Sequence, residues 1–98
     1  MQINITARHI DVTPAIEEYI RRKAERLPRY FDRVQQIDVV LERMPNEYKV
    51  EILTDVEKHR DFVATGSHED LYACVDVVCD RAVRQLTDWK QRIKQHKA

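Results

Sequence analysis

The side chains with the clearest chemical capacity are the basic groups near the C-terminus. Residues 81–98 contain six lysines or arginines and a single acid. Guanidinium and ammonium groups in such numbers can bind the phosphates of a nucleic acid. The six are Arg81, Arg84, Lys90, Arg92, Lys94 and Lys97. The same charges also suit the solvated C-terminal end of a helix, whose dipole favours cations, so the pattern alone leaves both interpretations open.

A second basic segment lies between residues 12 and 33, where Arg22 and Arg26 are spaced one helical turn apart. The middle of the chain has the opposite sign, because residues 34–80 contain eleven acids and only four bases. The formal net charge is zero, so total charge says nothing about a polyanionic partner. The segregation predicts a dipolar molecule that would meet a polyanion with its basic helices.

The sequence offers little other chemistry. Its four histidines are far apart, and its single glycine excludes a loop that cradles phosphates. The run His68-Glu69-Asp70 could be an acid–base cluster, but acids in the first turn of a helix explain it better. Cys74 and Cys79 would lie about 140° apart on one helix, which predicts two core thiols rather than a disulfide. We therefore predict no catalytic residue, metal ligand, cofactor or small-molecule substrate.

One long amphipathic helix, from residue 69 to the C-terminus, positions the basic groups. Its apolar residues recur at spacings of three and four, which is typical of a single buried face. They are Leu71, Val75, Val78, Ala82, Leu86, Trp89 and Ile93. Trp89 is therefore expected in the core rather than as a platform for stacking bases. The three arginines fall within about 80° of one another, away from this face, and the lysines flank its other side.

The start of the long helix has its own signals. Ser67 with Asp70 three residues later predicts a capping box. Gly66 before it predicts a turn with positive φ. About 27 helical residues would span about 40 Å, which is longer than a strand of seven or eight residues. The last two turns are therefore expected to project beyond a sheet.

The rest of the chain predicts four strands and one further helix. Thr13 and Pro14 are typical of a helix start, and Pro28 should end that helix near Leu27. The order β-α-β-β-β-α predicts an α+β domain with a four-stranded sheet and both helices packed on one face. Strands two to four form an antiparallel meander, which the first strand joins. The expected strands cover residues 2–8, 37–42, 48–53 and 61–65.

We expect one domain over residues 1–98, without a linker. No segment is typical of a signal peptide or a transmembrane span, which favours a cytoplasmic protein with no membrane partner.

Several short motifs occur in a fixed order along the chain. They are NIT at residues 4–6, TPAI at 13–16, LPRYFDR at 27–33, GSHEDLYA at 66–73, Asp76, and RQL at 84–86. Each is unspecific alone, but the ordered set resembles the ribosome hibernation promoting factor family over essentially the whole chain. The resemblance implies that family's fold, which is similar to double-stranded RNA-binding domains.

The resemblance also implies a function: a bacterial stress or stationary-phase factor that binds the small ribosomal subunit between its head and body. Bound there, such a factor covers the messenger and tRNA positions, inhibits translation and preserves idle ribosomes. Family members contact ribosomal RNA with basic residues on both helices. The matching positions are Arg81 and Arg84, then the less closely aligned Arg92 and Lys94, with Lys90 on the same helix and Arg22 and Arg26 on the first helix.

The chain departs from the family pattern at Asp88, where relatives commonly carry a base and where the acid could pair with Arg84 or Arg92. It lacks the second, dimerising domain of long members and the acidic tail of some short ones. It therefore resembles the short form that works with a separate ribosome modulation factor. A competing hypothesis is a protein–protein adaptor, whose long helix docks on a partner and whose basic face only aids solubility.

Overall fold

A computed structural model describes residues 1–30 and 32–96 and, within them, all side chains except those of residues 30 and 94–96. Four strands and two main helices follow one another in the predicted order, with a four-residue helix, α2, as an addition. The elements are β1 (Gln2–Arg8), α1 (Pro14–Ala24), α2 (Leu27–Tyr30), β2 (Val34–Arg43), β3 (Tyr48–Val56), β4 (His59–His68) and α3 (Leu71–His96).

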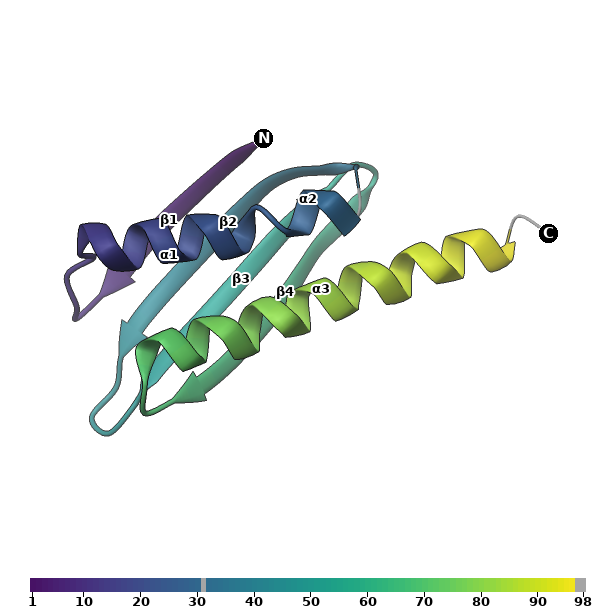
Figure 1. Cartoon of the computed structure of the whole chain (residues 1–98). Coiled ribbons are helices and arrows are strands. Elements are labelled where there is room, and N and C mark those ends of the chain that lie inside the picture. The colour runs from purple at the N-terminus through teal and green to yellow at the C-terminus, as the bar shows by residue number, and fades with distance from the viewer. Residues whose placement is uncertain (31, 97–98) are drawn as a thin grey trace.

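The strands form one sheet in the order β1-β2-β3-β4 (Figure 1). β2, β3 and β4 pair antiparallel, and β1 pairs parallel with β2. Both predictions for the sheet are confirmed. The parallel pairing follows from α1, which carries the chain back over the sheet between the two strands. β1 and β4 are the edge strands.

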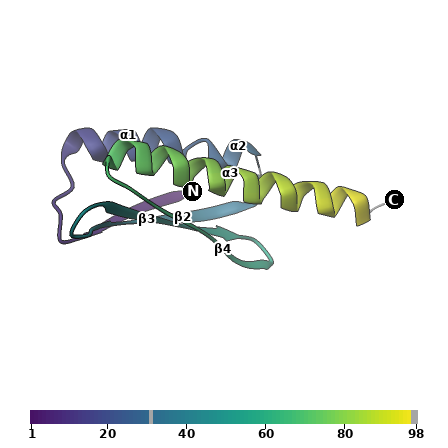
Figure 2. The same cartoon turned by 90° about the horizontal axis from the view of Figure 1, so that it is seen from below.

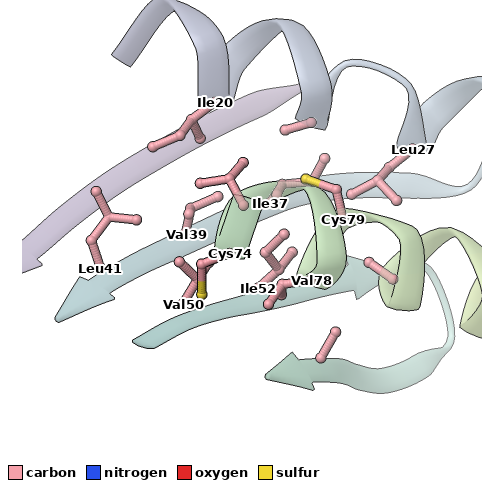
Figure 3. Packing of buried hydrophobic residues seen from close by; sticks show 14 of the residues in the cluster. Ile20, Leu27, Ile37, Val39, Leu41, Val50, Ile52, Cys74, Val78 and Cys79 are labelled. Atoms are coloured by element: carbon pink, nitrogen blue, oxygen red, sulfur yellow. The ribbon is translucent and has the colours of Figure 1, made fainter. Parts of the chain in front are cut away.

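The helices cover one face of the sheet (Figure 2), which confirms the layered arrangement expected from their single apolar faces. Alternate residues of the central strands point toward the helices, among them Val39, Leu41 and Ile52, which are at most 1% exposed (Figure 3). α3 contributes Val78 and Leu86 to the same core, and both are fully buried. The opposite face of the sheet has no covering layer in the described structure. It carries the acids Asp38, Glu42, Glu51 and Asp55.

The first helix begins as predicted but ends early. The backbone N–H of Ile16 donates to Thr13 Oγ1 at 3.2 Å, and Pro14 occupies the first helical position. α1 stops at Ala24 instead of continuing to Leu27, and Pro28 lies inside α2. The predicted end was therefore wrong. Proline is tolerated in the first turn of a helix, where its missing N–H has no partner to lose, so Pro28 fits a new short helix.

The start of α3 also differs from the prediction. Asp70 is itself the cap, since its Oδ1 accepts the backbone N–H of Ala73 at 3.1 Å. Ser67 lies in β4 and caps nothing, so the capping box was wrong. His68 Nδ1 accepts the backbone N–H of Asp70 at 2.9 Å, which makes this histidine part of the turn into the helix.

Gly66 does not form a turn, because β4 continues through it and its φ is not positive. A Cβ at this position would come within 2.9 Å of both Val78 Cγ2 and Arg81 Nη1. Gly66 therefore lets α3 approach the edge strand. β3 and β4 are both longer than the strands expected at residues 48–53 and 61–65. The turn between them is therefore shorter than expected and consists of Glu57 and Lys58, where Lys58 takes φ 62°.

α3 runs over β3 and β4 and then continues beyond the sheet (Figures 1 and 2). The overhang expected from the helix length is confirmed, and it makes the molecule elongated, with a longest dimension of 49 Å. Among the described residues, no helix is long and apolar enough to cross a membrane.

Candidate nucleic-acid interface

The basic residues on the outer half of α3 are the most available cations among those predicted. Arg84, Lys90 and Arg92 are exposed, and within the described residues none of them has an acidic partner within 4.0 Å. Lys94 lies within α3, but its side chain falls outside the described part, as does Lys97 altogether. Three unpaired cations on one projecting helix can meet phosphates without first breaking an ion pair.

Arg81 has a structural role as well as a charge. Its Nη1 donates to the carbonyl oxygen of Thr65 at 2.5 Å, on the outer edge of β4. Gln85, one turn further along α3, donates from Nε2 to the carbonyl oxygen of Val63 at 2.7 Å. The two side chains occupy edge acceptors that could otherwise pair with another strand. Because a guanidinium has five N–H donors, Arg81 retains others for a ligand.

The two predicted cations of the first helix are paired with acids. Arg22 Nη2 lies 2.8 Å from Glu18 Oε1, and both side chains are about 70% exposed. Arg26 Nη1 lies 3.7 Å from Asp80 Oδ1 on α3. An exposed pair of this kind contributes only about 0–1 kcal/mol, so either arginine could exchange its partner for a phosphate at small cost.

The contact between α1 and α3 was not foreseen from the sequence. The Tyr19 hydroxyl donates to Asp76 Oδ1 at 2.5 Å, and Lys23 Nζ lies 3.3 Å from the same oxygen. The hydrogen bond to Asp76, with a contribution from burial, raises the pKa of Tyr19 to about 12. Tyr19 also meets the ring of Tyr72 edge-on, with 4.9 Å between centroids. These contacts set the spacing of the two helices.

The six predicted residues whose side chains are described lie on different parts of the molecule. Arg22 lies on α1, and the unpaired cations lie on α3. Arg26 was expected on the first helix, but α1 ends at Ala24 and Arg26 lies in the turn that follows it. On α3 itself, Arg92 is on the side of β4, next to Phe62, and Lys90 is about 160° further around the helix. Ion pairs and side-chain direction thus separate residues that the sequence groups by charge alone.

The acid that interrupts the basic face has no ion pair either. Asp88 is exposed, and no basic nitrogen of the described residues lies within 4.0 Å of its carboxylate. The expected pairing with Arg84 or Arg92 is therefore absent. Trp89 beside it packs against the core, as predicted, but it is only half-buried and part of its ring stays accessible.

The two thiols are also where the sequence placed them. Cys74 and Cys79 are buried and unbridged, and burial raises the pKa of Cys79 to about 12, so it stays a neutral thiol. In the described part of the chain, no three histidine, cysteine or acidic side chains gather as a metal site would require.

Fold and surface together describe a small α+β binding domain with a projecting cationic helix. The family model described as "Sigma 54 modulation protein / S30EA ribosomal protein" matches residues 3–94, and the chain belongs to this family. The resemblance noted from the motifs is thereby confirmed.

Individual relatives are similar over nearly their full length. A ribosome hibernation promoting factor of Azotobacter vinelandii is 36% identical over 92 residues, which are 94% of this chain and 85% of the relative. The factor of the same name from Escherichia coli K12 is 36% identical over 99 residues, covering 98% and 100%. A ribosomal subunit interface protein from Coxiella burnetii has the same fold, with a TM-score of 0.86 at 22% identity over 93% of this chain and 99% of that one.

Proposed function

We propose that this protein is a ribosome hibernation factor that binds ribosomal RNA of the small subunit through the cationic face of α3. The family and the names of the relatives support the hibernation role, and they support a binding protein rather than an enzyme. In the proposed position the domain lies in the channel used by messenger and tRNA. It would thus inhibit translation and stabilise idle ribosomes under stress or in stationary phase. A protein that binds ribosomes in this way would lie in the cytoplasm.

One observation favours α3 as the RNA-binding surface. Arg84, Lys90 and Arg92 are exposed and without an ion pair in the described structure, and they lie on the helix that projects beyond the sheet. A polyanion gains most from cations that it need not free from acids. The uncovered face of the sheet carries acids instead, so it would be repelled by RNA. The domain is thereby oriented with α3 toward the ribosome.

α1 and the turn that follows it would supply the secondary contact. Arg22 and Arg26 are held in weak ion pairs, and RNA phosphates can compete for them. Residues 1–98 would act as a single ribosome-binding domain. A separate ribosome modulation factor would act with it where ribosomes are paired.

Co-sedimentation with purified small subunits tests the proposal. If about five phosphates are neutralised, affinity should fall about 10²- to 10³-fold between about 50 and 200 mM salt. Lys90→Glu should weaken binding, and the matched change Lys49→Glu on the uncovered sheet face should not. Affinity that hardly depends on salt, or equal loss in the two variants, would reject this surface and favour a protein–protein adaptor.

A further inference from the structure

A small hollow lies between α3 and the beginning of β4. It has a volume of about 150 Å³ and is lined by Phe62, Gln85, Asp88, Trp89 and Arg92. A cavity of about this volume in another protein holds one benzene ring. We call it the Trp89 hollow, and its size suits a single planar ring system rather than a helix or a peptide.

The apolar wall of the hollow is aromatic. Trp89 lies 6.2 Å from Phe62 between ring centroids, and His59 contacts both rings at 4.4 Å. His59 and Phe62 are stacked, with 3° between their planes. Trp89 and Phe62 are both only half-buried, so each leaves ring surface accessible. Partly exposed aromatic rings of this kind are the usual platform for unstacked bases.

The polar wall of the hollow offers one carboxylate that a ligand can reach. Asp88 is exposed, and its carboxylate has no ion pair among the described residues. Gln85 is not available in the same way, because its Nε2 donates to Val63 and its Oε1 is closed off from solvent. An ionised carboxylate has two oxygens that can each accept a ligand N–H. The hollow therefore suits a ring system with N–H groups along one edge.

We propose that the Trp89 hollow receives one unstacked guanine of single-stranded RNA. Its face would lie against Trp89, its N–H edge would donate to Asp88, and a phosphate next to it would bind Arg92. Among the four bases, guanine presents two neighbouring donors, a ring N–H and an amino group, which match the two oxygens of a carboxylate. This inference rests on the proposed binding of ribosomal RNA by α3 and adds a base-selective element to it.

Charge favours RNA over a protein partner. An arginine side chain could also stack on Trp89 and pair with Asp88. Arg92 lines the same hollow, however, and Arg84 lies one turn before Asp88 without an ion pair in the described structure. These two cations repel a guanidinium and attract a phosphate.

Trp89 is the only tryptophan of the chain, so its fluorescence reports on the hollow directly. The test titrates the full chain with short oligouridines that carry guanine, adenine or hypoxanthine at the centre. Guanine should quench Trp89 and bind about 5- to 150-fold more tightly than adenine. Hypoxanthine, which lacks the amino group, should fall between them.

Two variants separate base selection from general charge. Asp88→Asn should abolish the preference for guanine while quenching remains, because stacking is unchanged. Arg84→Gln, one turn away, should weaken all three oligonucleotides by the same factor. A wild-type melting curve for each variant shows that the fold is retained.

The outcomes are distinct. If ribosomes bind but no oligonucleotide quenches Trp89, the base site is rejected and the proposed function stands. Quenching by all three oligonucleotides alike, unchanged in Asp88→Asn, rejects selection by the carboxylate. Quenching by an arginine-rich peptide in place of the oligonucleotides assigns the hollow to a protein. If neither ribosomes nor oligonucleotides bind, both proposals fail.

Discussion

α1 and α3 lie on the same face of the sheet, and both carry cations, but those cations differ in what surrounds them. Every basic residue from 21 to 26 has an acidic partner, whereas Arg84, Lys90 and Arg92 on α3 have none in the described structure. The pairs are Arg21 with Glu17, Arg22 with Glu18, Lys23 with Asp76 and Arg26 with Asp80. Two of them lie within α1, and two reach across to α3.

The difference shows that a count of basic residues does not locate a binding surface. On α1, cations hold the helix to itself, to α3 and, through a bond from Arg21 to the carbonyl oxygen of Ile3 at 3.0 Å, to the sheet edge. On α3, Arg84, Lys90 and Arg92 form no such ion pairs among the described residues. A polyanion would therefore meet α3 first and would have to displace acids from α1.

The largest expected effect comes from placing a charge in the core between the helices and the sheet. Leu86 is fully buried, and Leu86→Asp would place a charge in the core. We expect a loss of about 4 kcal/mol or more in the free energy of unfolding, enough to unfold the domain. Thermal unfolding followed by circular dichroism checks this. Gln91→Asp, at an exposed position of α3, is the control, and a cooperative wild-type melt for Leu86→Asp would contradict the packing described here.

Charge reversal on each helix tests the comparison directly. Arg84→Glu removes an unpaired cation and should lower affinity for small subunits by about 10- to 100-fold. Arg22→Glu acts on a cation that Glu18 already neutralises, and we expect a loss of no more than about 3-fold. Binding titrations at two salt concentrations measure both. If both variants lose the same affinity for small subunits, the ion pairs of α1 do not keep its cations from binding RNA.

The junction between the helices should respond to alkaline pH. The pKa of Tyr19 is raised to about 12 by its bond to Asp76, so folding favours the protonated phenol. This contribution is complete below pH 10, the ordinary pKa of tyrosine, and is lost as pH rises toward 12. Tyr19→Phe should lower stability by about 1 kcal/mol at neutral pH, with the difference from wild type shrinking above pH 10.

Denaturant unfolding at a series of pH values measures that difference. Tyr72→Phe is the matched control, because the Tyr72 hydroxyl makes no hydrogen bond among the described residues. If the difference in unfolding free energy between Tyr19→Phe and wild type stays constant to pH 12, the hydrogen bond to Asp76 does not raise the pKa of Tyr19.

The smallest effect is expected from releasing a cation on α1. Glu18→Gln removes the partner of Arg22 but keeps the shape of the side chain. Because the pair is exposed, we expect stability to change by less than about 0.5 kcal/mol and ribosome affinity to rise about 2-fold. A competition binding assay against wild type resolves a change of this size. Weaker binding in Glu18→Gln would show that the acid itself contributes to the interface.

Much of the fold could be predicted because its signals are local. The alternation in the strands, Thr13 before Pro14 and the apolar face of the long helix each depend on residues within a few positions of one another. The error at Gly66 arose because a contact with a distant segment decided its role. Gly66 was interpreted as a turn residue, but it is needed where Val78 and Arg81 of α3 pass over β4.

The candidate site, too, was predictable in part from the sequence. The sequence by itself determined which residues are basic, that Arg22, Arg84 and Arg92 lie on helices, and that the C-terminal helix extends beyond its sheet, since charge and period are properties of the chain. Only the tertiary structure decided which cations are already partnered, as Arg26 is by Asp80, and which acceptors lack donors, as Gln85 Oε1 does. Partners such as Tyr19 and Asp76 are 57 residues apart, and no local pattern specifies a contact that arises only when two helices pack side by side.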